Sequence, residues 1–404
     1  MTAEPQSRAR RGASFVPMAV VLAGSVAVRA WRLDRPVQLV FDEFHYVPQA
    51  FAYLHGTATT IEVHPPLGKW LIAAGIKVFG ADTFGWRFVS LVFGAAVVAL
   101  TFLLAVRLLK STAWATVAAA LVGFDGLQIV QSRIAMLDIF LSAFILAGAL
   151  LAVVYVERGQ VGWLAAAGLM YGAALAVKWS ALPAIVFTGA AIIATTPKAE
   201  RRRTLALVGA CLLAVPMAVY LGSYVRFWDR SGVDLAGWFR QQRSMLDYNL
   251  GPVAGHPYAS KSLGWLFLRR PVTYFHAVSG DQVRDIVALG NPVLWWGFLA
   301  AVPLLVGAWV RRTDRTADVV MLAVAALYAP WLLVQRTSFQ YYLTPLVPFM
   351  AIGVVWALRR LPKPVVAGYL TVAAAAAVLL LPVWLGFPIS QHHYEWLLPL
   401  KSWR

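Results

Sequence analysis

Long apolar segments recur through almost the whole chain, and they limit the possible folds more than any other feature of the sequence. A run of roughly twenty apolar residues can cross a bilayer as a helix, and backbone inside hydrocarbon must satisfy its own hydrogen bonds. Hydrophobic residues make up 60% of the 404-residue chain and charged residues only 13%, whereas a soluble domain carries about 25% charged residues. The candidate spans are 14–31, 86–109, 113–131, 137–156, 162–177, 180–196, 204–224, 293–310, 317–334, 340–358 and 365–386. We therefore predict an all-α polytopic membrane protein with about eleven transmembrane helices.

The first apolar run, 14–31, has the hydrophobicity of a signal peptide but not its other features. It is long for that role, has no evident small-residue cleavage site, and ends in Arg29 and Arg32. We expect an uncleaved first span that follows a basic cytoplasmic tail, 1–13. The membrane domain then covers 14–386, and a second tail covers 387–404.

Basic residues cluster in the short connections between the apolar runs, and this clustering predicts the orientation of the chain. A formal charge of +17 would also suit a nucleic-acid partner, but the clusters follow the positive-inside rule, so no nucleic acid is expected. With the N-terminus in the cytoplasm, every basic cluster is cytoplasmic. Loops 32–85 and 225–292 and the tail 387–404 are then extracytoplasmic. The basic residues are Arg107, Lys110, Arg158, Lys198, Arg201, Arg202, Arg203, Arg311, Arg312, Arg315, Arg359, Arg360 and Lys363.

Loop 32–85 contains two adjacent carboxylates, Asp42 and Glu43, followed about twenty residues later by His64-Pro65-Pro66-Leu67-Gly68-Lys69. After the two prolines, apolar residues recur at helical spacing over too short a stretch to span, which predicts an interfacial helix. A second apolar stripe begins at Phe44. Because Pro48 would disturb the first turns of a helix starting at Asp42, we expect that helix to start near Val47. Asp42, Glu43, His45 and Tyr46 would then lie on non-helical backbone facing a cavity.

These residue types suit the transfer of a sugar from a lipid phosphate to an alcohol. Such a reaction needs a base for the attacking hydroxyl and cations that stabilise the departing phosphate. Cations near predicted span ends are costly in hydrocarbon unless paired or functional; they are Lys69, Arg87, Arg133, Lys178 and Arg336. The simpler alternative is a solvated acidic turn that pairs with Arg32 or Arg35, with lysines that reach lipid headgroups.

Several stretches, in this order, resemble the protein O-mannosyltransferases, from about residue 30 to 350. They are Phe41-Asp42-Glu43, Val63-His64-Pro65-Pro66-Leu67-Gly68-Lys69, Trp86-Arg87-Phe88, Ser132-Arg133 with Leu137-Asp138, Val177-Lys178-Trp179-Ser180, Gly290-Asn291-Pro292, and Arg336-Thr337-Ser338-Phe339-Gln340-Tyr341-Tyr342. The chain has no large insertion in loop 225–292, unlike the eukaryotic members, so it resembles the actinobacterial type. The resemblance implies a C-type glycosyltransferase fold.

The resemblance also implies a reaction: inverting, metal-independent transfer of mannose from polyprenyl-phosphate-mannose to Ser or Thr of secreted proteins, with no cofactor. Asp42 would be the general base, and Glu43 would orient Asp42 or the acceptor. Arg87 and Arg133 would serve the donor phosphate or hold the loop, and His64 and Lys69 would shape the site. The implied partners are the lipid donor, membrane lipid, and an acceptor polypeptide that arrives from the secretion translocon.

The sequence is also compatible with other functions. A related glycosyltransferase that modifies a glycan or lipid would use the same loop. A transporter or flippase would place charges near the bilayer midplane, where Asp125 is the principal acid. Asp125 is either functional or part of a structural ion pair across the 113–156 helices, where Arg133 and Asp138 are near in sequence. Loop 225–292 either covers the site or is an aromatic-rich interfacial loop. His392, His393 and Glu395 fit no common zinc spacing and indicate a solvated tail.

Overall fold

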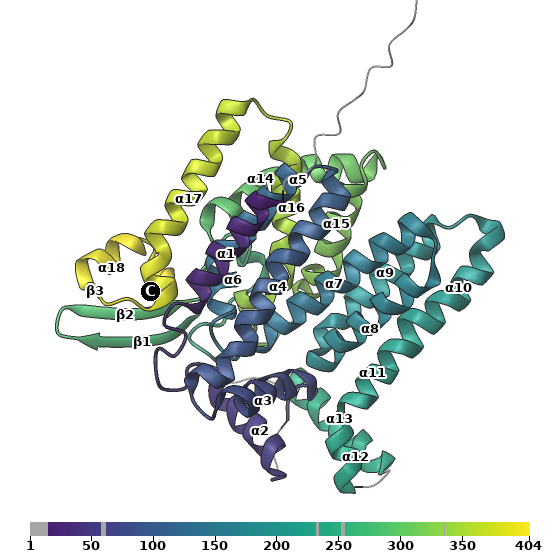
Figure 1. Cartoon of the computed structure of the whole chain (residues 1–404), viewed down its shortest axis with the longest axis horizontal. Coiled ribbons are helices and arrows are strands. Elements are labelled where there is room, and N and C mark those ends of the chain that lie inside the picture. Colours follow the sequence, from purple (N-terminus) through teal and green to yellow (C-terminus); the bar gives the residue numbers. More distant parts are fainter. Residues whose placement is uncertain (1–14, 58–61, 232–233, 252–254, 335) are drawn as a thin grey trace, which may run out of the picture.

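The computed structural model describes residues 15–57, 62–231, 234–251, 255–334 and 336–404, and it is a predominantly helical bundle (Figure 1). The predicted basic tail, 1–13, lies outside the described residues. The helices are α1 (Val16–Ala30), α2 (Glu43–His55), α3 (Leu67–Phe79), α4 (Thr83–Leu109), α5 (Thr112–Gly123), α6 (Gly126–Gln131), α7 (Leu137–Arg158), α8 (Val161–Val177), α9 (Leu182–Thr195), α10 (Arg201–Gly209), α11 (Val215–Ser223), α12 (Val225–Ser231), α13 (Leu235–Leu250), α14 (Pro292–Val310), α15 (Arg315–Leu327), α16 (Val347–Leu358), α17 (Lys363–Leu385) and α18 (Gln391–Leu397). The strands are β1 (Thr273–Ser279), β2 (Gln282–Val287) and β3 (Ile389–Ser390).

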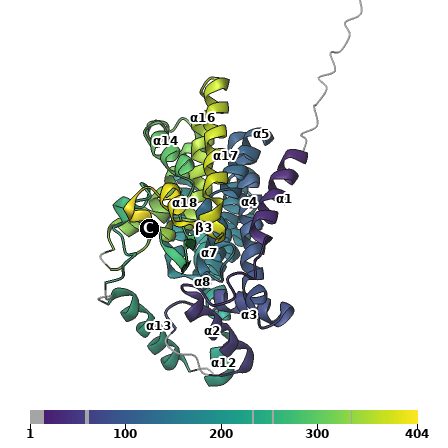
Figure 2. The same cartoon turned by 90° about the vertical axis from the view of Figure 1, so that its left-hand side faces the viewer.

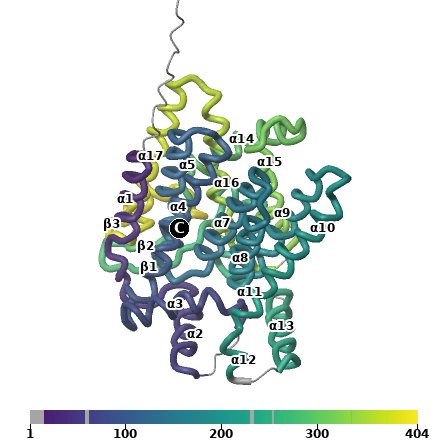
Figure 3. The backbone as a smooth tube through the Cα atoms, turned by 45° about the vertical axis from the view of Figure 1, so that its right-hand side comes forward, coloured from purple at the N-terminus to yellow at the C-terminus, as the bar shows by residue number. Residues whose placement is uncertain are grey.

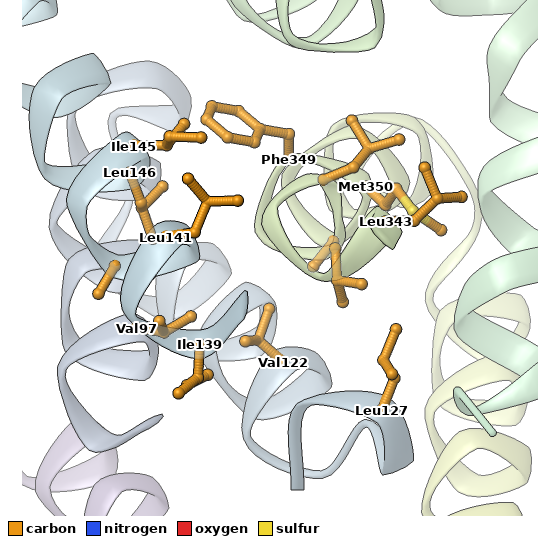
Figure 4. Close-up of a cluster of buried hydrophobic side chains, with 14 of the residues drawn as sticks. Val97, Val122, Leu127, Ile139, Leu141, Ile145, Leu146, Leu343, Phe349 and Met350 are labelled. Atoms are coloured by element: carbon orange, nitrogen blue, oxygen red, sulfur yellow. The ribbon is translucent and has the colours of Figure 1, made fainter. Parts of the chain in front are cut away.

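Among the described residues, seven helical segments are long and apolar enough to span a membrane, and four shorter apolar helices accompany them. These segments fall on the predicted apolar runs, so the polytopic helical architecture is confirmed. The eleven-span count itself stays a prediction. The segment Gln340–Leu358, which contains the 3-10 turn η6 (Gln340–Leu346) and α16, is 94% buried, so it forms the centre of the bundle. Figure 4 shows its Leu343 and Met350 in one apolar cluster with Val97, Val122 and Ile139.

The run 113–131 is not one helix, and Asp125 is the reason. Helix α5 ends at Gly123, and Asp125 caps α6 by accepting a hydrogen bond from the Gln128 N–H at 3.1 Å. The other carboxylate oxygen accepts from the Asn291 N–H at 2.8 Å and from Trp295 Nε1 at 3.0 Å. Asp125 thus accepts hydrogen bonds from uncharged groups, and Arg133 donates to backbone carbonyls instead, so the predicted structural ion pair in this region is wrong. The first four N–H groups of a helix have no partner within the helix, and a carboxylate at this position can accept a hydrogen bond from one of them.

Helix α2 begins at Glu43, four residues earlier than Val47, so that prediction is wrong. Pro48 is the sixth residue of the helix, where its missing N–H interrupts the hydrogen-bond ladder without ending the helix. Helix α3 follows Pro65-Pro66 as predicted, but the protein packs against its Gly68, Lys69 and Ile72 face. Figures 1, 2 and 3 place α2, α3, α12 and α13 together at one end of the bundle.

The segment 225–292 and the C-terminal tail contain structure that the all-α prediction missed. Strands β1 and β2 form an antiparallel hairpin, and β3 pairs with β2 from the far end of the sequence. The tail is not simply solvated. Tyr394 is buried and donates a hydrogen bond to Asp285 at 2.6 Å, and Trp403 Nε1 donates to the Leu268 carbonyl at 2.6 Å. These contacts fasten the hairpin to the C-terminus.

The basic connections meet at the opposite end of the bundle. Glu157 accepts from Arg107 at 2.6 Å, Arg315 at 3.1 Å and Lys110 at 3.3 Å, and Arg359 donates to the Leu109 carbonyl at 3.0 Å. The ends of α4, α7 and α16 and the start of α15 are therefore held together on one side. The basic clusters in the sequence and the contacts in the structure thus place the same connections on one side of the bundle.

Two glycines on α8 allow unusually close packing against the segment α10–α11. A Cβ on Gly168 would lie 1.8 Å from the Cys211 carbonyl oxygen, and one on Gly172 would lie 2.8 Å from the Cα of Pro216. The spacing of four residues matches the small-residue pattern that brings membrane helices into backbone contact.

We predict that Gly168→Ala lowers stability by about 1–3 kcal/mol, because the added methyl overpacks the contact of α8 with the Cys211 backbone. Gly162→Ala on the same helix is the matched control, since a Cβ there meets nothing within 4 Å. Thermal unfolding of both purified variants in detergent measures the difference. Equal midpoints for the two variants would contradict the close-packing interpretation.

Candidate active site

Asp42 immediately precedes α2, but its carboxylate does not cap the helix. Its backbone is helical, with φ −69° and ψ −4°, and the side chain makes no capping hydrogen bond, whereas a capping residue usually has extended backbone. The half-buried carboxylate instead faces two tyrosine hydroxyls. Tyr46 Oη and Tyr341 Oη each donate to Oδ2 at 3.4 Å. Asp42 makes no ion pair with any described residue.

Glu43, the neighbouring acid, has the opposite environment. It is fully buried and forms a two-pronged ion pair with Arg87, with both N···O distances at 2.8 Å. Each oxygen accepts one more hydrogen bond, from the Ala135 N–H at 2.9 Å and the Val40 N–H at 3.0 Å. The carboxylate is therefore fully occupied by the protein, and of the two adjacent acids only Asp42 is available for a substrate.

Arg87, at the start of α4, joins this carboxylate to the preceding loop. Besides Glu43, its guanidinium donates to the carbonyls of Leu33 at 3.3 Å, Pro36 at 3.0 Å and Gln38 at 3.3 Å. A guanidinium has five N–H donors, and these five contacts use all of them. The Arg87 side chain thus holds the chain from 33 to 43 in one conformation and has no donor left for a ligand.

Arg133 is used in a similar way at the end of α1. Its Nη1 donates to the carbonyls of Val28 at 3.2 Å, Arg29 at 2.6 Å and Trp31 at 2.7 Å, and Nη2 donates to Arg32 at 3.3 Å. The last carbonyls of a helix have no partner within it and carry partial negative charge. Arg133 therefore stabilises the point at which the chain leaves α1 and enters the Asp42 loop.

Lys178 lies on the other side of the Asp42 carboxylate. Its buried ammonium group pairs with Asp138 at 2.8 and 3.0 Å. It also lies 5.1 Å from the centroid of the Tyr342 ring and 5.8 Å from that of Tyr341, within the range of a cation–π interaction. Because Tyr341 also donates to Asp42, the same tyrosine contacts both the base candidate and this cation.

Arg336 approaches the same tyrosine pair from the segment that precedes η6. Its Nη2 donates to Tyr342 Oη at 3.5 Å, and its Nη1 donates to Asn249 Oδ1 at 2.9 Å. Asn249, at the end of α13, also donates to the carbonyl of Val63, next to His64, at 3.2 Å. Helix α13 thereby connects the Arg336 loop with the His64 segment, so loop 225–292 is part of this site.

His64 stands among three cations and is held neutral. Burial, and then the charges of Lys178, Lys69 and Arg336, keep the pKa of the His64 imidazole well below its usual value. Lys69 is committed elsewhere, because its buried ammonium donates to the His64 carbonyl at 2.8 Å and pairs with Glu62 at 3.2 Å. Lys178, like Lys69, is paired with a carboxylate, whereas Arg336 makes no ion pair with any described residue.

The pKa of the Asp42 carboxyl is raised, and burial is the main cause. The charges of Lys178 and His45 and the hydrogen bond from Tyr341 lower it, while the charge of Asp138 raises it further. A carboxylate destabilised by burial is a stronger base than one in water. It remains ionisable because a cation and a hydroxyl donor lie close by.

Phe41 connects the site with the hairpin. Its backbone has φ +47°, which is rare for a bulky residue and costs of order 1–3 kcal/mol unless the surroundings fix it. The ring stacks on Tyr274 of β1, with centroids 4.5 Å apart and planes within 8°. Tyr274 is in turn 5.8 Å from the Tyr341 ring and accepts a hydrogen bond from Gln131 at 2.8 Å. The stack sets the direction of the backbone that enters Asp42.

The structure brings Asp42, His64, Lys178 and Arg336 into one region and places Arg87, Arg133 and Lys69 in contacts around it. Sequence reasoning gave no role to Tyr341, Tyr274 or Asn249. The Tyr341-Tyr342 pair close to Arg336 in the sequence could have indicated a contact with the site, because a buried tyrosine hydroxyl needs a hydrogen-bond partner. Nothing local to Asn249 or Tyr274 indicated their contacts.

Comparison with known families gives matches over nearly the whole chain. The profile described as "Dolichyl-phosphate-mannose-protein mannosyltransferase" matches residues 19–230, and "C-terminal four TMM region of protein-O-mannosyltransferase" matches residues 235–403. The polyprenol-phosphate-mannose–protein mannosyltransferase of Mycobacterium tuberculosis is 32% identical, over 90% of this chain and 86% of that protein. The protein of the same name from Corynebacterium glutamicum is 29% identical, over 90% and 88%.

Solved structures share the fold at low sequence identity. The Saccharomyces cerevisiae protein O-mannosyltransferase Pmt1-Pmt2 complex bound to the sugar donor matches with a TM-score of 0.84 and 16% identity, over 96% of this chain and 92% of that one. ArnT from Cupriavidus metallidurans, bound to undecaprenyl phosphate, matches with a TM-score of 0.63 and 19% identity, over 91% and 65%.

We predict that Arg87→Met destabilises the protein by about 3–5 kcal/mol, because it leaves the Glu43 carboxylate buried without its partner. Arg35→Met is the control in the same loop: its pair with Asp34 is about half exposed, at 55% and 53%, and exposed pairs contribute little. Thermal unfolding in detergent and limited proteolysis of the first loop measure the effect. If Arg87→Met unfolds at the same temperature as Arg35→Met, the buried pair does not hold this loop.

Proposed function

The chain belongs to the dolichyl-phosphate-mannose-protein mannosyltransferase family, and from that membership we propose that it transfers mannose from a polyprenyl phosphate to serine or threonine hydroxyls of secreted polypeptides. The protein is a multi-pass membrane enzyme. The names of the M. tuberculosis and C. glutamicum relatives, most of whose length the chain covers, support this donor and this class of acceptor.

The environment of Asp42 is the observation that carries the proposed mechanism. It is a carboxylate of raised pKa, without an ion pair, beside the fully occupied Glu43. In the proposed step, Asp42 takes the proton of the acceptor hydroxyl while the hydroxyl oxygen attacks the anomeric carbon of mannose. The bond from that carbon to the phosphate oxygen breaks on the opposite face, so the configuration inverts. The polyprenyl phosphate leaves as an anion and needs no proton.

Lys178 and Arg336 are the proposed partners of the donor phosphate. Both lie against Tyr342, one over its ring and one at its hydroxyl, and their charges act on the neutral His64 between them. Fixed cations next to the leaving oxygen stabilise charge as it develops there. A neutral His64 adds an N–H donor to this group without adding charge.

Glu43, Arg87, Arg133 and Lys69 are proposed as positioning residues. Each is engaged in hydrogen bonds with the protein, and together they hold the loop from α1 to α3. In this arrangement Glu43 orients Asp42 through the backbone, because the two residues are adjacent and only Glu43 is anchored on both carboxylate oxygens.

We further propose that the Asp42 end of the bundle faces away from the cytoplasm. The basic connections gathered around Glu157 lie at the other end, which the positive-inside rule assigns to the cytoplasm. The acceptor then reaches the site from the extracytoplasmic side as it leaves the secretion translocon.

We predict that Asp42→Asn lowers mannosyl transfer by about 100- to 10,000-fold, the usual contribution of a general base, without unfolding the protein. Asp34→Asn, an exposed acid of the same loop, is the control and should keep normal activity. The measurement is transfer of radiolabelled mannose from polyprenyl-phosphate-mannose to a Ser/Thr-rich peptide by purified protein. Near-normal transfer by Asp42→Asn excludes Asp42 as the base.

The pH dependence of the reaction should depend on Tyr341. The hydrogen bond from Tyr341 lowers the raised pKa of Asp42, so Tyr341→Phe raises that pKa further. Because the base must be ionised, activity is lost as pH falls through this pKa, and the acid limb of the kcat/KM profile should move to higher pH. Tyr369→Phe, whose hydroxyl donates to the Val293 carbonyl at 2.8 Å instead, should leave the limb in place. A shift to lower pH in Tyr341→Phe would contradict the assignment.

A further inference from the structure

Strand β1 is an edge strand of the small sheet. The order is β1-β2-β3, so β2 is paired on both sides and β1 only on one. Figure 1 shows the hairpin projecting from the bundle, with β1 on the side facing the end that holds α2 and α3, and β2 on the side of α18. The unpaired edge of β1 therefore lies on the same side of the molecule as the candidate active site.

The register shows which backbone groups lie on that free edge. The turn Gly280-Asp281 joins Ser279 and Gln282, which are paired directly opposite each other. In an antiparallel ladder closed by such a turn, hydrogen-bonded pairs alternate with non-hydrogen-bonded ones. The residues paired with Asp285 and Val283, which are His276 and Val278, therefore direct their N–H and C=O groups away from β2.

The sequence of β1 does not protect this edge. Natural edge strands usually carry Lys, Pro or inward-pointing charges that prevent another strand from pairing. Strand β1, Thr-Tyr-Phe-His-Ala-Val-Ser, has none of these, and its Val278 is 59% exposed. The charged residues of the hairpin are Asp281 in the turn and Arg284 and Asp285 on the internal strand β2.

The exposed part of the edge, from His276 to Ser279, runs toward the site, and the register is irregular between Thr273 and Phe275 at its inner end. At one end, Tyr274 stacks on Phe41, which is covalently joined to Asp42. At the other end, Ser279 lies five residues away, about 17 Å along an extended strand at roughly 3.3 Å per residue. A polypeptide paired along β1 would leave the Tyr274 end beside the Asp42 carboxylate.

We propose that the acceptor polypeptide binds by adding an extended strand to the free edge of β1, which delivers its next serine or threonine to Asp42. This inference rests on the proposed function, because it names the acceptor subsite of the same reaction. Strand addition uses main-chain hydrogen bonds for affinity and leaves alternate side chains unconstrained. Such a subsite accepts many sequences, provided that the segment is extended and keeps its N–H groups at alternate positions.

The first experiment compares Val278→Pro with Val278→Ala. Proline removes the outward N–H at a position where edge strands tolerate it, and alanine changes the side chain while keeping the N–H. We expect Val278→Pro to raise the KM for a twelve-residue Ser/Thr peptide about threefold to tenfold, the value of one lost hydrogen bond, and Val278→Ala to leave it unchanged. Equal KM values for both variants, with the hairpin intact by circular dichroism, would overturn the proposal.

The second experiment leaves the enzyme unaltered, so that a folding defect cannot affect it. Single backbone N-methylations are placed along the same peptide on the side away from the modified serine. The expected result is a rise in KM that alternates with period two, because only every second amide faces β1. N-acetylated threonine amide, too short to reach β1, should be mannosylated equally by wild type and Val278→Pro. A flat N-methylation profile overturns strand addition alone, whereas absence of mannose transfer from polyprenyl-phosphate-mannose to any peptide overturns the proposed function.

Discussion

The ion pair between Glu43 and Arg87 is the interaction on which the arrangement of the site depends. Both side chains are fully buried, and such a pair persists only when every donor and acceptor is satisfied. Here the carboxylate accepts four hydrogen bonds and the guanidinium donates five, and two of these join the two side chains to each other. The others connect the exit from α1, the start of α2, the start of α4 and the turn before α7. Four segments are thus fixed around one pair of charges. Asp42 gains a defined position from this network without contributing its own carboxylate to it.

The separation of roles between adjacent acids explains how a site near a membrane can keep one carboxylate reactive. A carboxylate that is paired and fully hydrogen-bonded is a weak base, whereas one that is buried without a partner would take up a proton and lose its charge. Asp42 is between these limits, with tyrosine hydroxyls at 3.4 Å and the Lys178 charge beyond them. Lys178 is itself held by Asp138, so the cation influences the base without neutralising it.

The apolar runs predicted the helices well, because a span must be both long and apolar, and such a signal is local. The same reasoning failed where a single side chain determines whether a helix continues. Asp125 interrupts the run 113–131, because its carboxylate accepts hydrogen bonds from N–H groups of α6 and of residue 291. Only the folded chain brings residue 291 to this position. The hairpin had a local signal in Gly280-Asp281 between β-prone runs, but loop 225–292 was left open between a cover for the site and an aromatic-rich interfacial loop, and no strand was predicted. The charged residues that the resemblance named lie around Asp42 in the structure, and their roles stay predictions. The protein contacts of Arg87 and Arg133 were not predictable, because they are made to carbonyls of residues 28–38 that the sequence does not place near either side chain.

The contact between Asp42 and Tyr341 joins residues 299 positions apart, and it has a consequence for biosynthesis. A ribosome-bound chain displays the acid soon after its first helix inserts, yet the hydroxyl that tunes it is translated only when most of the bundle is already in the bilayer. Maturation of the enzyme is therefore a late event. Chains that stall or are degraded before residue 341 is translated contain Asp42 without this hydroxyl contact.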